Sequence, residues 1–360
     1  MDASVSFARK QGRMRKRLTA LLAGALVAAG SLGGVPATAA VPLAAPVAQS
    51  VGAGSKAEAL PKRLPPAAEK AAMAAADAKA KSKIANAQKK FGAKAAVKGA
   101  PPARSGASSS ADSMSLMAGP YFLYITAQSS ASPAISGAVD NVAISKPYLH
   151  SSDYHTLAEV AVSTAGSGNI VEVGYNVDPV VNGNSNPHLF VFNWVGGTPG
   201  CYNGCGFVPY GTGVQAGDDI NSAVGTSVFM EIQHFSGAWW IRYGSDWVGY
   251  FPDSDWPGST FTSINFTQVF GEVAAATPTP CTDMGKGILG NSANTATAAK
   301  LGSYSQVPNV GTNVLTGPSP VPNTIPTNVY TGYAQSARTF VYGGPGWNSA
   351  GTGAGTTGSC

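Results

Sequence analysis

After Leu116 the chain consists of short runs of β-branched and aromatic residues, separated by Gly, Asn, Ser, Asp and Pro. Such runs form strands, and the residues between them form turns. Turn signals such as Ser236-Gly237, between two apolar runs, predict hairpins and therefore antiparallel pairing. We expect an all-β fold, an antiparallel β-sandwich, over residues 116–360. The expected strands are Tyr121–Ala127, Val139–Ser145, Thr156–Ser163, Asn169–Val177, His188–Trp194, Ser227–Phe235, Ala238–Tyr243, Asp246–Phe251 and Thr262–Ala274.

The last part of this domain, from Thr277 to Cys360, is rich in loop-forming residues. Prolines gather between Pro308 and Pro326, and the end is rich in glycine. Because both residue types interrupt regular elements, this tail is expected to wrap the sandwich as loops.

The chain begins with a basic segment followed by a short apolar one. Six Lys and Arg residues between Arg9 and Arg17 precede an apolar run from Leu18 to Ala29. Ala37-Thr38-Ala39 then supplies the small-x-small pattern that signal peptidase accepts. The apolar run is too short to span a bilayer. Residues 1–40 are therefore predicted to be a signal peptide of a secreted protein that keeps no membrane segment after cleavage.

Residues 41–115 are rich in Ala, Pro and Lys, with Phe91 as the one aromatic residue. Such a segment buries little surface. Ala67 to Lys98 has helix-forming composition, so a marginal solvated helix or disorder is expected here instead of a packed domain. Composition leaves two roles open: a spacer that holds the domain away from a cell surface, or a propeptide.

Charge is divided unevenly along the chain. Residues 1–115 hold 18 Lys and Arg against 5 Asp and Glu, whereas residues 116–360 hold 5 against 13. The basic pI of about 8.9 therefore reflects the leader, and the predicted mature domain is acidic. This distribution argues against nucleic acid as a partner.

Four cysteines in an exported chain favour disulfide bonds. Cys201 and Cys205 would close a very small ring, and a disulfide is favoured over a metal half-site because no second cysteine pair or nearby His completes a tetrahedron. For Cys281 and Cys360 two outcomes stay open: they pair and tie down the tail, or Cys360 bonds to another molecule.

Two expected strands each carry one glutamate among apolar residues, Glu172 beside Gly174 and Glu272 beside Gly271. Side chains alternate across a strand, so Glu172 lies opposite the apolar face that contains Tyr175. Taken singly, each glutamate suits a solvated sheet face. If the two strands lie side by side, one acid can act as general base on a water while the other, its pKa raised by burial and by its neighbour's charge, holds the proton as general acid.

Other catalytic patterns are missing from the sequence. It has no Gly-x-Ser-x-Gly, no His-Glu-x-x-His and no Gly-x-Gly-x-x-Gly that opens a helix. The histidines are scattered, which favours surface or hydrogen-bonded roles over a zinc site; they are His150, His155, His188 and His234. We expect no metal and no cofactor. The aromatic residues suit either core packing or a substrate wall.

Five short motifs in register resemble the neprosin family between about Gly119 and Tyr304. They are Ile170 to Tyr175, Gly200-Cys201-Tyr202 to Cys205-Gly206-Phe207-Val208, Trp239-Trp240 with Gly249 to Pro252, Phe270 to Val273, and Met284 to Gly287. The resemblance implies a secreted, metal-independent glutamic peptidase on an antiparallel β-sandwich that cuts after proline at acidic pH. It places the catalytic glutamates on Glu172 and Glu272.

From the aromatic residues we select Tyr175, Trp194, Trp240 and Tyr250 as the expected substrate wall. The family's plant members usually carry Trp where Tyr175 stands and Gly where Phe270 stands. Their pro-domain supports the propeptide reading of residues 41–115. We expect this basic segment to dock on the acidic cleft as an inhibitor, which leaves when the carboxylates are protonated.

Two other classes of function share these features. A β-sandwich glycoside hydrolase or glycan-binding module also uses paired carboxylates and aromatic platforms, although the Glu-x-Asp-x-x-Glu strand pattern is missing after Glu172. A non-catalytic surface protein would carry the leader as a stalk and would place the two glutamates far apart.

Overall fold

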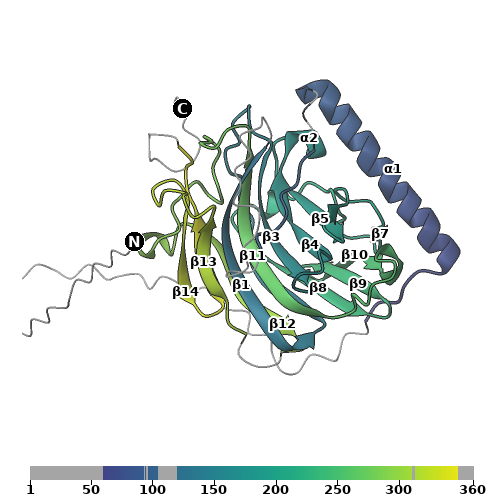
Figure 1. The fold of residues 1–360 in the computed structure, drawn as a ribbon. Coiled ribbons are helices and arrows are strands. Elements are labelled where there is room, and N and C mark those ends of the chain that lie inside the picture. Colours follow the sequence, from purple (N-terminus) through teal and green to yellow (C-terminus); the bar gives the residue numbers. More distant parts are fainter. Residues whose placement is uncertain (1–59, 93, 95, 104–119, 310–312, 348–360) are drawn as a thin grey trace, which may run out of the picture. The chain divides into compact units, whose positions relative to one another are not determined.

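The computed structural model describes residues 60–92, 94, 96–103, 120–309 and 313–347. The predicted signal peptide and Cys360 lie outside these residues. From residue 59 onward the chain forms one unit, in which two antiparallel sheets pack face to face (Figure 1). The helices are α1 (Pro66–Phe91) and α2 (Pro179–Asn182). The strands are β1 (Tyr121–Ile135), β2 (Gly137–Ala143), β3 (His155–Ser163), β4 (Ile170–Val177), β5 (His188–Val195), β6 (Thr198–Pro199), β7 (Val208–Pro209), β8 (Ser227–Phe235), β9 (Ala238–Tyr243), β10 (Asp246–Pro252), β11 (Ile264–Ala275), β12 (Ala299–Val307), β13 (Thr316–Val321), β14 (Thr331–Ser336) and β15 (Thr339–Gly343).

The nine expected strands are all present, and the predicted sandwich is confirmed. One sheet has the order β13-β1-β11-β3-β4-β5-β6 and the other the order β14-β15-β12-β2-β8-β9-β10-β7. The two strands that carry Glu172 and Glu272, β4 and β11, do not lie side by side. β3 lies between β4 and β11 and pairs with both. Side chains of β3 therefore lie between the two glutamates.

The tail is not the loop wrap that its prolines predict. Residues 299–343 contain four strands, β12 to β15, which extend both sheets. The prolines of this region are tolerated because β13, which contains Pro318 and Pro320, is an edge strand that pairs only with β1. An edge strand can lack N–H donors on its open side, so proline content alone does not exclude strands here.

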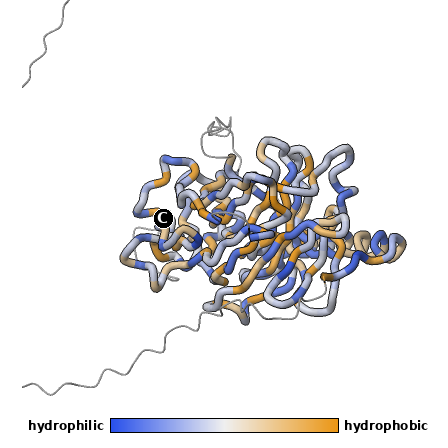
Figure 2. The backbone as a smooth tube through the Cα atoms, turned by 90° about the horizontal axis from the view of Figure 1, so that it is seen from below, coloured by the Kyte–Doolittle hydropathy of each residue, from blue (hydrophilic) through white to orange (hydrophobic). Residues whose placement is uncertain are grey.

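The main core fills the space between the two sheets. Hydrophobic and hydrophilic positions alternate along the chain in Figure 2, as strands with two different faces require. Val171, Val173 and Tyr175 of β4 point into this core together with Trp239 and Ile241 of β9. The face of Glu172 is therefore the outer face of its sheet.

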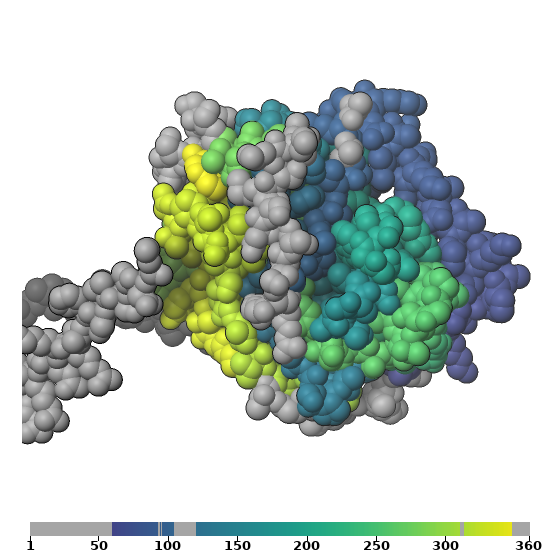
Figure 3. Space-filling view, in the orientation of Figure 1, coloured from purple at the N-terminus to yellow at the C-terminus, as the bar shows by residue number. Residues whose placement is uncertain are grey.

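The leader packs on the sandwich, which corrects the expectation of a solvated helix or disorder. Helix α1 has a proline in its first turn and Lys89 and Lys90 in its last turn, where each residue type favours a helix. Its buried residues, Ala76, Ala80 and Ala87, lie on one face. α1 runs along the side of the sandwich past α2 and β7 (Figures 1 and 3). No helix in the described residues is long and apolar enough to cross a membrane.

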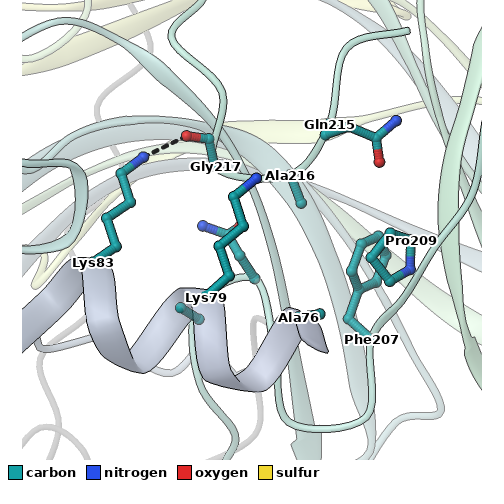
Figure 4. Close-up of a pocket in the computed structure, with 10 residues that line it drawn as sticks. Ala76, Lys79, Lys83, Phe207, Pro209, Gln215, Ala216 and Gly217 are labelled. Atoms are coloured by element: carbon teal, nitrogen blue, oxygen red, sulfur yellow. Dashed lines mark hydrogen bonds between the residues drawn. The ribbon is translucent and has the colours of Figure 1, made fainter. Parts of the chain in front are cut away.

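Polar contacts also hold α1 in place. Asp77 accepts a hydrogen bond from the backbone N–H of Cys205 at 2.6 Å, and Lys83 donates one to the carbonyl oxygen of Gly217 at 2.5 Å (Figure 4). A pocket of about 80 Å³ remains between the helix and the loop around Gly217. Small alanine side chains and polar contacts therefore hold α1 on the sandwich.

Candidate active site

Three carboxylates converge on the outer face of the first sheet. Glu272 lies on β11, Glu159 on β3 and Glu172 on β4, and all three side chains are fully buried. The strand register explains their meeting. Glu272 is opposite Leu157 and Glu172 is opposite Ala161, while Glu159 lies between these two positions on the same face of β3.

Glu159 was missed in the sequence, and the glycine in β4 makes room for it. A Cβ atom at Gly174 would lie 2.6 Å from the Cβ of Glu159 and 2.2 Å from the carbonyl oxygen of Ala158. No side chain fits there. The space that Gly174 leaves beside Glu172 is therefore occupied by the third acid.

Lys98 of the leader reaches into the centre of the three carboxylates. Its Nζ lies 3.3 Å from Oε1 of Glu159, 3.3 Å from Oε2 of Glu172 and 3.1 Å from Oε2 of Glu272. The lysine side chain is 2% exposed. Because one nitrogen contacts all three carboxylates, Glu172 and Glu272 lie close enough to hold a single small molecule between them. The two sequence-predicted acids are thus brought together.

The environment separates the pKa values of these acids. Burial, and then the charge of Glu272, raise the pKa of Glu172 to about 7 against the opposing effects of Lys98 and Trp194. Burial alone would raise the pKa of Glu272, but Lys98 and His155 lower it below its ordinary value. Burial and Glu172 raise the pKa of Glu159 well above its ordinary value. Glu272 is therefore the acid that stays ionised most readily.

Two more residues contact the acids directly. Trp194, an expected wall residue, lies on β5 and donates from Nε1 to Oε1 of Glu172 at 2.8 Å. His155, at the start of β3, places Nε2 2.9 Å from Oε1 of Glu272. His155 is the one scattered histidine that the fold brings to the acids.

The leader crosses this face as an extended peptide. Tyr202 and Tyr124 donate hydrogen bonds to the carbonyl oxygens of Val97 and Ala100, at 3.1 and 3.0 Å. The side-chain amide of Gln268 donates to the carbonyl oxygen of Pro102 at 2.7 Å. These donors bind carbonyl oxygens of the leader's backbone, and we call this part of the outer sheet face, around the three glutamates, the groove.

Gly99 is the tightest point of this passage. Its N–H donates to Oε1 of Glu272 at 3.2 Å. A Cβ atom at this position would lie 2.0 Å from Oη of Tyr124 and 2.9 Å from Oε1 of Glu272. A residue with a side chain at this position would therefore collide with Tyr124 and Glu272.

The other three expected wall residues lie elsewhere. Tyr175 points into the sandwich interior, on the opposite face of β4 from Glu172, as strand alternation already required. Trp240 and Tyr250 lie on the second sheet in a separate aromatic cluster. Oη of Tyr250 donates to Glu69 of α1 at 2.8 Å. These two residues bind the leader helix and do not line the groove.

The expected disulfide between Cys201 and Cys205 is present. It shapes the loop that carries Tyr202, whose ring packs against Phe190 and Phe192 in the groove cluster. The pairing of Cys281 with Cys360 stays a prediction. The described residues contain no cluster of His, Cys, Asp or Glu suited to a metal.

The sequence profile of the Neprosin family matches residues 152–345, more than half of the chain. This chain belongs to the Neprosin family. The resemblance seen in the motifs is therefore confirmed, and the matched range includes all three glutamates and His155. A search of curated proteins found no match. Membership of the Neprosin family, together with the convergent glutamates, supports a glutamic-type peptidase.

Solved structures with a similar fold are distant from this Neprosin-family chain. Scytalido-glutamic peptidase with a peptide-based transition state analog has 11% identity and a TM-score of 0.34, covering 63% of this chain and 100% of its own. SCP-B, an Eqolisin-family peptidase in complex with the tripeptide Ala-Ile-His, has 10% identity and a TM-score of 0.35 over the same shares. CG-16, a homodimeric agglutinin from chicken liver, has 10% identity and a TM-score of 0.26, covering 41% of this chain and 93% of its own.

Proposed function

We propose that this protein is a secreted endopeptidase that cleaves peptide bonds after proline at acidic pH, and that its leader is an inhibitory propeptide. One observation carries the proposal. A segment of the chain itself lies in the groove through hydrogen bonds to its peptide carbonyls, and its Lys98 occupies the point where three glutamates meet.

The proposed chemistry uses the separated pKa values of Glu172 and Glu272. A water takes the place of the Lys98 ammonium. Ionised Glu272 removes a proton from this water while the water oxygen attacks the peptide carbonyl carbon. Protonated Glu172 then gives its proton to the leaving nitrogen. Protonated Glu159 lies beside them and can donate a hydrogen bond to the developing oxyanion. No step needs a metal.

The proline preference is what the family resemblance implies, and two prolines of the leader lie a few residues from the acids. Pro101 and Pro102 are both buried in the groove. Phe270, where plant members usually have Gly, packs edge-on against Tyr124 at 5.6 Å and faces Lys98 at 5.5 Å. Its ring therefore shapes the site, whereas the other departure, Tyr175, is in the core and does not touch the substrate.

Release of the leader at acidic pH is expected because the positive charge of Lys98 favours the ionised form of the glutamates. Lys98 lowers the pKa of all three glutamates. The three glutamates therefore bind fewer protons while the leader is docked than after it is released, and docking weakens as pH falls. The contribution of Glu172 is lost as pH falls through about 7, and that of Glu272 is lost at lower pH. Incubation at about pH 4, near the ordinary carboxylate pKa values, should shorten the chain by roughly the leader's length. An unchanged size would reject acid release.

A panel of peptides and glycans tests the class of substrate. The acid-treated protein is expected to cut proline-containing peptides on the carboxyl side of proline, and to release no reducing sugar from polysaccharides. Mass spectrometry of the fragments locates the cut bond. Cuts spread evenly over residue types would reject the proline preference, and sugar release without proteolysis would favour the glycosidase class.

Trp194→Phe is expected to move the alkaline limb of the pH profile of kcat/KM to higher pH. The indole N–H stabilises ionised Glu172, so its loss raises the pKa of that carboxyl, which must be protonated to act as the acid. At the plateau the change should stay below about tenfold, the effect of one hydrogen bond. A limb that stays in place or moves to lower pH would show that Glu172 is not the acid.

A further inference from the structure

His155 contacts the base that the proposed function assigns. Its imidazole is fully buried at the start of β3, with Nε2 2.9 Å from Oε1 of Glu272. Its other ring nitrogen, Nδ1, lies 3.7 Å from Oδ2 of Asp178. The ring is therefore held between two carboxylates. Burial alone would lower the pKa of His155, but Asp178 and Glu272 raise it.

Asp178 is fixed by the backbone of α2. Its Oδ1 accepts hydrogen bonds from the N–H groups of Val180 and Val181, at 2.9 and 3.0 Å. This N-cap arrangement leaves Oδ2 facing His155. A helix start thus orients the carboxylate, the carboxylate faces the imidazole, and the imidazole contacts Glu272.

The polar surroundings of His155 come from three elements. Glu272 faces it from β11, Asp178 from the start of α2, and the Tyr202 ring from the disulfide loop at a centroid distance of 6.5 Å. Among the described residues, no other charged side chain forms an ion pair with His155.

Two cations contact Glu272 in the described part of the chain, Lys98 and His155. Lys98 belongs to the leader, which must leave before a substrate can enter. His155 belongs to the sandwich and stays. After the leader has left, it alone of the two offsets the burial of the Glu272 carboxylate.

We propose that His155, oriented by Asp178, is a positioning residue that keeps Glu272 ionised and aimed into the groove once Lys98 has left. The inference rests on the proposed function, in which Glu272 is the base. Loss of the imidazole would make Glu272 hold its proton more tightly, so activity would be lost at a higher pH as the solution is acidified.

The test uses the full chain with Lys98→Met, which removes the leader's cation from Glu272. His155→Leu in this background should move the acidic limb of kcat/KM to higher pH and lower the rate at about pH 4 by about tenfold or more, the effect of one charge-assisted hydrogen bond. His155→Gln keeps a hydrogen-bond donor but carries no charge. Its acidic limb should lie between that of the Lys98→Met background and that of His155→Leu. His234→Gln is the matched control, because His234 forms a similar 2.8 Å contact with Asp253 away from the groove.

A carboxyl-carbon NMR titration of Glu272 in the same variants needs no catalysis. Glu272 should titrate at higher pH in His155→Leu than with His155 present. Equal titration in the two proteins would overturn the role of His155, whether or not the protein cleaves peptides. A shifted titration in a protein without peptidase activity would instead reject the proposed function and leave the His155 contact standing.

Discussion

Full-length protein with Lys98→Met is expected to cleave a proline-containing peptide at about pH 6 without prior acid treatment, whereas the untreated parent is nearly silent. Lys98 is buried, and its ammonium is shared by three glutamates. Removing one partner of a buried ionic group costs about 3–5 kcal/mol. Docking of the leader should therefore weaken roughly 10²- to 10⁴-fold, and the initial cleavage rate measures the fraction released.

Two further variants separate charge from general damage to the leader. Gly99→Ala adds a methyl group that collides with Tyr124 and changes no charge, so it should also release the leader. Lys90→Met is the control, because the Lys90 ammonium lies on the surface, away from the glutamates, 3.4 Å from the carbonyl oxygen of Gly183 and 4.8 Å from the centre of the Phe91 ring. The acid-treated parent, assayed at the same pH, shows the full rate. If Lys98→Met cleaves the peptide no faster than the untreated parent, Lys98 does not keep the leader in the groove.

The second large effect is expected from the acids themselves. In the Lys98→Met background, Glu272→Gln and Glu172→Gln should each lower kcat/KM by about 10²- to 10⁴-fold, the usual contribution of a general base or acid. Glu159→Gln should lower it less, because an amide resembles the protonated carboxyl that burial favours at this position. The cleavage rates of the three variants are measured on one peptide, with mass spectrometry of the released fragments.

Glu231→Gln controls for the loss of an acid elsewhere. Glu231 lies on β8 of the other sheet, 3.9 Å from Arg242, and its replacement should leave kcat/KM unchanged. Thermal unfolding of all four variants checks that each still folds. If Glu172→Gln and Glu272→Gln cleave as their background does, the groove is not the site of hydrolysis.

The sandwich could be predicted because strand patterns are local. The runs that form β3, β4 and β11 show their alternation of side chains within eight to twelve residues. Strand order is not local. Nothing in the run around Glu172 indicates that β3 pairs with β4 on one side and with β11 on the other. The two predicted acids therefore meet, but across a strand that the sequence did not place between them.

Glu159 could have been found by the reasoning that found the other two acids. It stands among apolar residues in an expected strand, on the same face as Leu157 and Ala161. Strand alternation also placed Tyr175 on the core face, which contradicted its place in the substrate wall. His155 had no such signal, because its role depends on the contact between β3 and β11 and on the start of α2.

The leader was the least predictable part. Its Ala-rich composition indicates a helix, but docking depends on small residues that recur on one face and on contacts with Gly217 and Cys205, far along the chain. Its basic charge pointed to the acidic cleft. Which lysine enters the cleft follows from the narrow passage at Gly99, which only the folded groove defines.

The most direct measurement is a crystal structure of the acid-treated protein with a proline-containing product peptide. The peptide's new carboxylate should lie within hydrogen-bond reach of both Glu172 and Glu272, in the place of the Lys98 ammonium. A peptide bound near Trp240 and Tyr250, or Lys98 still between the glutamates in protein that cleaves peptides, would contradict a groove in which the leader and the substrate compete for the same acids.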